Sequence, residues 1–158
     1  MITRLSSCRH LLFAFALVVA PISLEAQRAT EWQLHAMANV GGDTFLGGGI
    51  GFALRTNGRM RVGVTASAGD LEGAAAIRPE LLGSFHLNPF KRQGVSPYAS
   101  AGVAAVFSDE YSRWYIVALV GIESRPGTAF GWFVEAGLGG GARLAAGVQY
   151  RKRRTRAR

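Results

Sequence analysis

Apolar residues occupy every second position through most of the chain after residue 27. In the stretch EWQLHAMANV, which begins at Glu31, the tryptophan, the leucine, both alanines and the valine share one face. The glutamate, glutamine, histidine and asparagine lie on the other face. Strict alternation indicates β-strands with one apolar face. The chain also contains 21 glycines, and each costs about 1 kcal/mol in a helix interior. We therefore expect an all-β fold.

Eight alternating segments can be counted, and turn-forming residues separate them. The segments are residues 31–40, 45–55, 59–68, 75–87, 97–107, 114–123, 129–139 and 142–150. Short connections predict antiparallel pairing between sequence neighbours. Asn57-Gly58 is the strongest turn signal, because a two-residue type I′ turn needs a positive φ at both positions. The pattern predicts one eight-stranded antiparallel up-and-down β-barrel.

The run Gly-Leu-Gly-Gly-Gly at residues 137–141 has two interpretations, a phosphate-binding loop or a hairpin turn. A dinucleotide-binding fingerprint needs a helix directly after its glycines and then another strand. The residues that follow, 142–150, alternate as a strand instead. We therefore expect a hairpin turn.

The two ends of the chain differ from its body. Residues 1–26 are typical of a cleaved signal peptide, with Arg4 and Arg9 before the apolar stretch LLFAFALVVA. The only cysteine, Cys8, lies inside this segment, so the body, residues 27–150, has no disulfide. Most of the net charge of +8 lies in residues 151–158, RKRRTRAR, which we expect to form a disordered basic tail. The body is nearly neutral, and we expect no nucleic-acid partner.

Three features predict that the apolar face points outward into lipid. No lysine lies in the eight segments, and the opposite face is mostly small residues with a few charges. Aromatic residues gather near segment ends, as in the two girdles of a transmembrane barrel. The expected girdle residues are Trp32, Phe52, Phe85, Trp132 and Tyr150 at one rim and Phe107 and Trp114 at the other.

This arrangement resembles the small eight-stranded outer-membrane barrels, the superfamily of the outer membrane protein A transmembrane domain. The final segment strengthens the resemblance, because Leu144, Ala146, Val148 and Tyr150 alternate and end in an aromatic residue. The resemblance implies a location in the bacterial outer membrane. It also implies two partners, the lipid of that membrane and the barrel assembly machinery, which would bind the last strand.

Charged residues are expected inside the barrel, where they must be paired. The inward positions hold Glu31, Arg55, Arg59, Arg61, Arg78, Glu80, Glu123, Glu135 and Arg143. The hairpin places Glu135 diagonally from Arg143, and Arg78 and Glu80 lie at a comparable depth. The network formed by these four residues could be a structural plug or a gated ion path. The plug is favoured, because eight strands leave an interior only wide enough for side chains.

Catalytic and metal-binding residues are scarce. The body has two histidines, His35 and His86, without the spacing of a metal site. Ser84, His86 and Glu80 suggest a hydrolase, but Ser84 and His86 point in the same direction from one strand rather than toward each other. We therefore expect no enzyme activity and no cofactor, and a structural or interaction role at the cell envelope. The alternatives are a narrow pore, a lipid-modifying enzyme and a soluble periplasmic barrel that binds an apolar ligand.

Overall fold

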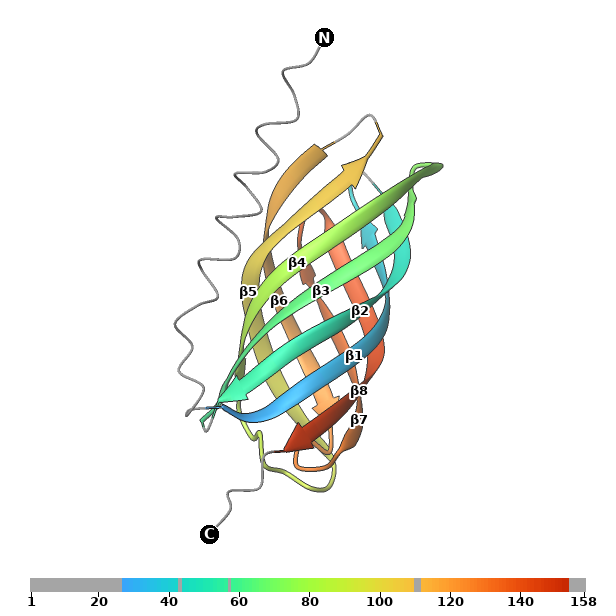
Figure 1. Ribbon diagram of the computed structural model, residues 1–158. Helices are drawn as coiled ribbons and strands as arrows, with labels where there is room; N and C mark the ends of the chain where they lie inside the picture. The colour runs from blue at the N-terminus through green and yellow to red at the C-terminus, as the bar shows by residue number, and fades with distance from the viewer. Residues whose placement is uncertain (1–26, 43, 57, 110–111, 154–158) are drawn as a thin grey trace.

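The computed structural model describes residues 27–42, 44–56, 58–109 and 112–153. These residues form a closed antiparallel barrel (Figure 1). Each strand pairs with its sequence neighbours, and β1 pairs with β8 to close the barrel. The strands are β1 (Gln27–Val40), β2 (Phe45–Thr56), β3 (Met60–Leu71), β4 (Ala74–His86), β5 (Val95–Ser108), β6 (Ser112–Ser124), β7 (Phe130–Leu138) and β8 (Ala142–Arg153). The predicted all-β, eight-stranded antiparallel barrel is confirmed. Among the described residues, no helix has the length and hydropathy needed to cross a membrane.

The strands differ from the predicted segments mainly at their ends. β1 begins four residues before its predicted segment, at Gln27. β8 continues through Arg151 to Arg153 and so includes three residues assigned to the basic tail. Residues 1–26, the predicted signal peptide, and residues 154–158 lie outside the described residues. The barrel is therefore longer at its C-terminal edge than the terminal aromatic residue suggested.

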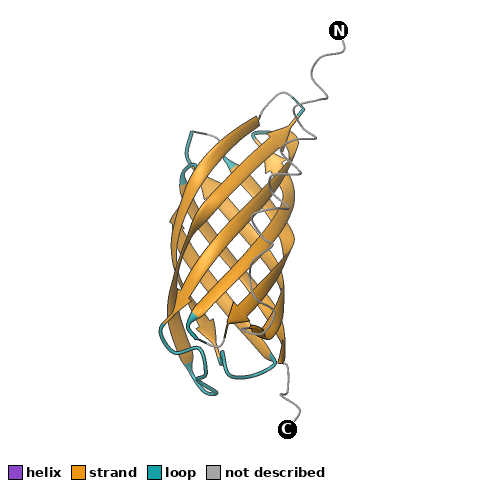
Figure 2. Ribbon diagram, turned by 60° about the vertical axis from the view of Figure 1, so that its left-hand side comes forward, coloured by secondary structure: helices purple, strands orange, loops and turns teal. Residues whose placement is uncertain are grey.

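The two ends of the barrel can be told apart by their connections (Figure 2). At the end that we call proximal, β1 begins, β8 ends, and the connections are residues 57–59, 87–94 and 125–129. At the distal end the connections are residues 41–44, 72–73, 109–111 and 139–141. Three of the four distal connections have two or three residues and the fourth has four, so only a few residues join the strands at this end.

Two turns depend on backbone conformations that favour glycine. Glu72 and Gly73 form a two-residue turn with φ of 53° and 90°, and Leu71 pairs directly with Ala74. The glycine run forms the β7–β8 hairpin, in which Gly140 and Gly141 have φ of 82° and 148°. The hairpin interpretation is confirmed.

The connection between β2 and β3 corrects the two-residue turn that was expected at Asn57-Gly58. Thr56 is the last residue of β2 and Met60 the first of β3, so three residues connect the two strands. Asn57 itself lies outside the described residues. Thr56 organises this connection, because its Oγ1 accepts a hydrogen bond from the Gly58 N–H and donates one to the Met60 carbonyl.

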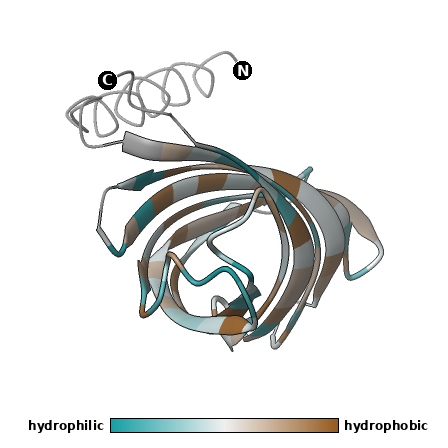
Figure 3. Cartoon of the chain, turned by 90° about the horizontal axis from the view of Figure 1, so that it is seen from below, coloured by the Kyte–Doolittle hydropathy of each residue, from teal (hydrophilic) through white to brown (hydrophobic). Residues whose placement is uncertain are grey.

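The outward face is apolar, whereas the inward face holds the charged and polar side chains together with small residues and some buried apolar ones. Figure 3 shows hydrophobic and hydrophilic residues alternating along the strands of the closed ring. Ile116, Leu46 and Val120 have 82%, 66% and 66% of their surfaces exposed on the outside. Such a surface is far more apolar than a water-soluble protein tolerates over a continuous area. The alternation therefore separates an apolar exterior from an interior that contains the charged side chains.

Pro79 interrupts the ladder between β4 and β5. Ile77 pairs with Phe107 and Glu80 with Ala104, but Arg78 and Pro79 have no partner on β5. The register is the same on both sides of this gap, so no bulge is present. Proline has no N–H to donate, which explains the local loss of pairing.

Candidate functional site

The interior of the barrel is the part of the molecule that gathers its ionisable side chains. Nine charged residues there are at most 6% exposed: Glu31, Arg55, Arg61, Arg78, Glu80, Glu123, Glu135, Arg143 and Arg151. This set corrects the expected one at two positions. Arg59 lies on the outside, just before β3, with its guanidinium carbon 6.0 Å from the centre of the Phe85 ring. Arg151, which was expected in a solvated tail, is buried inside.

Four of these residues form what we call the distal cluster: Arg78, Glu80, Glu135 and Arg143. Arg143 lies between the two carboxylates, with Nη1 at 2.8 Å from Glu135 Oε1 and Nη2 at 2.9 Å from Glu80 Oε2. Arg78 Nε donates to Glu80 Oε1 at 2.9 Å, and its Nη2 donates to the Gly139 carbonyl at 2.7 Å. The cluster is electrically balanced and is anchored to the β7–β8 turn.

The strand register explains why Glu135 and Arg143 meet. Arg143 pairs across the ladder with Gly137, and Glu135 pairs with Ala145. Glu135 and Arg143 are therefore diagonal neighbours on the same face of adjacent strands, a spacing that long side chains can bridge. Gly137 has no side chain to block the path between them.

A second group, the proximal cluster, consists of Glu31, Arg55, Arg61, Glu123 and Arg151. Arg55 bridges the two carboxylates, at 2.6 Å from Glu31 and 3.1 Å from Glu123. Arg151 does the same, at 2.6 Å from Glu123 and 3.3 Å from Glu31. Arg61 adds a contact of 3.4 Å to Glu31. Three guanidinium groups thus surround two carboxylates, so burial of each carboxylate is compensated by more than one cation.

Tyr98 connects the two clusters. Its hydroxyl donates a hydrogen bond of 3.0 Å to Glu135 in the distal cluster. Its ring stacks on His86 with centroids 4.9 Å apart, and the Arg61 guanidinium carbon lies 5.3 Å from the ring centre. His86 Nδ1 lies in turn 2.7 Å from Glu123. A continuous polar network therefore joins the two clusters through His86 and Tyr98. Tyr98 and Arg151 were not identified as interior residues from the sequence.

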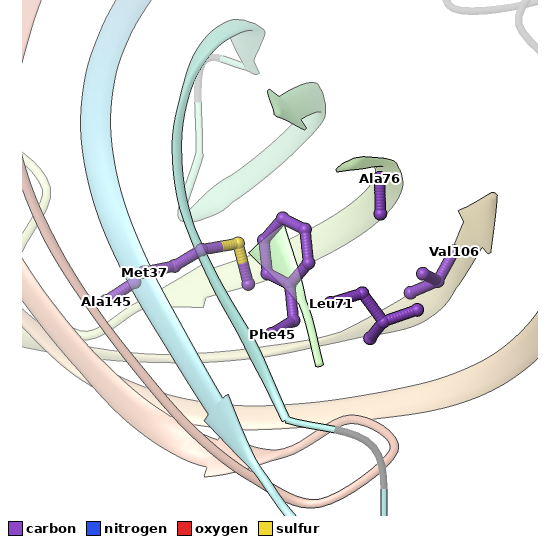
Figure 4. Close-up of a cluster of buried hydrophobic side chains, with 6 residues drawn as sticks. All are labelled: Met37, Phe45, Leu71, Ala76, Val106 and Ala145. Carbon is purple, nitrogen blue, oxygen red and sulfur yellow. The ribbon is translucent and has the colours of Figure 1, made fainter. Parts of the chain in front are cut away.

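An apolar cluster occupies the distal part of the interior. It comprises Met37, Phe45, Leu71, Ala76, Val106 and Ala145 (Figure 4). Phe45 begins β2 and Leu71 ends β3, so both lie at the distal mouth. In Figure 4 the Met37 side chain points toward the Phe45 ring. These side chains fill space that water would need in order to enter from the distal end.

The residues considered for catalysis do not form a catalytic pair. Ser84 Oγ accepts hydrogen bonds from Ser100 at 2.8 Å and Arg61 at 3.4 Å, and no bond joins it to His86. His86 instead faces Glu123, while His35 shares a contact of 2.8 Å with Ser67. A nucleophile must lie within hydrogen-bond reach of its base. Within the described part of the chain, no three His, Cys, Asp or Glu side chains converge on a possible metal site.

The expected girdle aromatics all lie on the outward face. Near the proximal end, Trp32 pairs across the ladder with both Phe52 and Tyr150. Tyr150 also pairs with Phe130, an outward aromatic residue outside the expected set. At the distal end, the rings of Phe107 and Trp114 pack edge to face with centroids 6.3 Å apart. The aromatic residues are therefore grouped toward the two ends of the barrel.

Comparison with known proteins identifies the fold. No family model matches the chain, and no curated protein matches its sequence. The N-terminal β-barrel domain of OprF from Pseudomonas aeruginosa is similar in structure, with a TM-score of 0.58 and 17% identity over 80% of this chain and 98% of that one. The chain has the fold of the small eight-stranded outer-membrane barrels.

Two further structures have a similar barrel fold. The outer membrane protein OprG from Pseudomonas aeruginosa superposes with a TM-score of 0.56 and 12% identity, over 82% of this chain and 98% of that one. A chain from the de novo design of transmembrane β-barrels has a TM-score of 0.54 and 16% identity, over 80% and 97%. Because a designed chain can also have it, the fold alone does not specify a biological role.

Proposed function

We propose that the chain is a non-enzymatic barrel of the bacterial outer membrane with a structural or interaction role, and that its filled interior does not conduct. The observation that carries this proposal is the ion-paired network across the barrel. Nine charged side chains and an apolar distal cluster occupy the space that a channel would need. Ser84, the nucleophile considered from the sequence, is hydrogen-bonded to Ser100 and Arg61 rather than to His86, which supports the absence of enzyme activity.

The exterior supports a location in a membrane. Large apolar side chains such as Leu34, Ile50 and Val148 are more than half exposed along the middle of the strands. The strands have 9 to 14 residues, and a tilted strand needs about 9–11 to cross the hydrocarbon core. A soluble barrel that binds an apolar ligand would have the opposite arrangement, with its apolar face inside.

The interior supports closure rather than conduction. An ion path would require Arg143 or Arg55 to leave the carboxylates that they bridge. Breaking a buried ion pair is costly, on the order of 3–5 kcal/mol, because the remaining charge is left without compensation. The two clusters together contain several such pairs, so spontaneous opening of the whole barrel is disfavoured. The proposed role is therefore that of a rigid membrane element.

Conductance measurements test the closed interior. The protein would be refolded into lipid vesicles and fused with a planar bilayer, with a general porin as the positive control and protein-free vesicles as the negative control. We expect no current steps above the baseline. Reproducible steps from the wild-type protein would instead support the narrow pore.

Membrane fractionation tests the location separately. We expect the protein in the outer-membrane fraction, and we expect unheated samples to migrate differently on SDS gels from boiled samples, because a closed barrel resists SDS until it is heated. A soluble product whose mobility does not change on boiling would contradict the membrane proposal, whatever its conductance.

A further inference from the structure

An apolar groove lies on the outer wall of the barrel near the proximal end. It spans β4 to β7 and has a volume of about 550 Å³. Its lining includes Phe85, Leu87, Ala99, Val120, Ile122 and Ala136. The register accounts for its shape, because Val120 pairs with Ala99 on one side and with Ala136 on the other. The small side chains on both sides of Val120 leave space on the surface, and the bulkier Phe85, Leu87 and Ile122 also line it.

A second cavity adjoins this groove at the proximal rim. Its volume is about 430 Å³, and it is lined by Arg59 and by residues 87–91, which include Asn88, Phe90 and Lys91. Leu87 lines both cavities. Arg59 is also close to the groove, because its guanidinium group lies over the ring of Phe85, a groove residue. An apolar surface on the wall therefore leads directly to cationic groups at the rim.

The surface charge of the barrel is asymmetric. Within the ranges that the structure describes, every exposed charged side chain at the proximal end is basic: Arg59, Lys91, Arg92, Arg125 and Lys152. The exposed carboxylates of the described residues, Asp70, Glu72 and Asp109, all lie at the distal end. The cavity at the proximal rim thus opens into a region of positive potential that attracts anions.

We propose that this part of the barrel binds a phospholipid with an anionic head group. An acyl chain would lie in the groove over Ala99, Val120 and Ala136, and the phosphate region would contact Arg59 and Lys91. A lipid suits both halves of the site, because its chain matches the apolar wall and its head group matches the cationic rim. The proximal end would face the leaflet that contains phospholipid. This inference requires the membrane location proposed above but not the closed interior.

Native mass spectrometry of the refolded full chain tests the charged half of the site. The protein would be equilibrated with equal amounts of palmitoyl-oleoyl phosphatidylglycerol and the matching phosphatidylcholine, and the retained lipids would be counted. We expect the wild-type protein to retain phosphatidylglycerol preferentially. The combination Arg59→Glu with Lys91→Glu should reduce this preference by roughly tenfold, since each basic residue near an anionic lipid contributes a few-fold in affinity. Equal retention of the two lipids by the wild-type protein would overturn the proposal.

Matched variants distinguish a site from a general charge effect. Lys152→Glu changes one exposed positive charge at the same end of the barrel but on β8, away from the groove, and should leave the preference unchanged. The matched variant at the proposed site is the single change Arg59→Glu, which should reduce the preference for phosphatidylglycerol. If both single changes reduce it equally, attraction is a property of the whole rim and the proposed site is wrong.

A third pair of variants tests the groove itself. Ala136→Phe would fill it from the outward face and should abolish lipid retention, whereas Ala36→Phe, on the outward face of β1, should not. Retention that survives Ala136→Phe would overturn the acyl-chain half of the site. Folding of each variant is checked by heat-dependent gel mobility. If the glutamate combination fails to fold, Arg59→Gln with Lys91→Gln replaces it, and an unchanged preference in that folded combination would overturn the proposal.

Discussion

At the scale of single residues, the polar network depends on positions that lack a side chain. Tyr98, Gly121 and Glu135 lie in one row across β5, β6 and β7. The Tyr98 ring extends over Gly121, so that its hydroxyl reaches Glu135 at 3.0 Å. A Cβ atom on residue 121 would lie only 2.5 Å from Tyr98 Cζ. The glycine is therefore part of the site, although it contributes no polar atom.

Replacing Gly121 should displace Tyr98 and weaken its hydrogen bond to Glu135. We expect Gly121→Ala to destabilise the barrel by about 1–3 kcal/mol, the usual cost of overpacking. Gly83→Ala is the matched control, because a Cβ there would have no contact closer than 3.8 Å. Urea unfolding in lipid vesicles measures both variants. Equal losses in the two would show that the space over Gly121 is not required.

A double-mutant cycle tests the pair formed by Glu135 and Arg143. The single changes Glu135→Leu and Arg143→Met should each lower the free energy of unfolding by about 3–5 kcal/mol, because each leaves a buried charge without its partner. The two changes together should recover much of that loss, since the Arg78–Glu80 pair remains balanced. Glu135→Gln should also be destabilising, because it leaves Arg143 with one carboxylate. Unfolding free energies in lipid vesicles provide the measurement, and strictly additive losses would mean that the two side chains do not interact.

At the scale of secondary-structure elements, β8 closes the barrel and completes the proximal cluster. It pairs with β1 from Ala29↔Arg153 to Val40↔Ala142. Its inward positions follow odd numbers through Arg143, Gln149 and Arg151. Arg151 therefore forms ion pairs with Glu31 and Glu123 from near the end of the closing strand. Its basic sequence context is typical of a solvated chain end.

Two truncations separate the strand from the segment that follows it. Deleting residues 154–158 should leave assembly and stability nearly unchanged, because β8 is retained in full. Deleting residues 151–158 should destabilise the barrel by several kcal/mol, since Glu31 and Glu123 lose one of the cations that compensate their burial. Pulse-chase fractionation and urea unfolding would compare the two. If both truncations behave alike, Arg151 has no structural role.

At the scale of the whole molecule, the apolar exterior predicts a stability that depends on lipid. Ile50 lies in the middle of β2 and Val40 at the end of β1, and both are about 60% exposed on the outside. In a bilayer, an arginine costs about 2–4 kcal/mol at the midplane and about 0–1 kcal/mol near the interface. In water both substitutions would cost little.

We therefore expect Ile50→Arg to reduce the unfolding free energy in lipid vesicles by about 2–4 kcal/mol. Val40→Arg is the control and should reduce it by less than about 1 kcal/mol. Conductance is not part of this comparison, so the result is independent of whether the barrel is open. Similar small effects at both positions would indicate that Ile50 does not face hydrocarbon.

Several parts of the structure follow from local patterns. The alternation around Trp32 and Leu34 predicts both the strand and the face that is apolar, because side chains in a strand point alternately to its two sides. The glycine run before Ala142 predicts a turn, and its connection to β7 then places Glu135 diagonally from Arg143. These inferences need only one strand or one hairpin, and a hairpin is set by residues close in sequence.

Other parts depended on the closed barrel. Arg59 and Arg61 are two positions apart and would point to the same side of one continuous strand. Arg59 nevertheless lies outside, because β3 begins only at Met60. Arg151 lies two positions after Gln149, so the alternation predicts that both face inward if they belong to one strand. The burial of Arg151 therefore depends on whether β8 extends past Tyr150. The extension exists because β1 offers pairing partners as far as Ala29, and no local pattern in residues 151–158 shows this.

The sequence alone determined the strands, their antiparallel order and the separation of an apolar from a polar face, because these depend on residues a few positions apart. The tertiary structure decided which charges share a cluster. Arg55, Glu123 and Arg151 come from β2, β6 and β8, and they meet only because the sheet closes on itself with one particular stagger between its edges. That stagger brings distant strands to the same depth, and it is a property of the whole ring rather than of any segment.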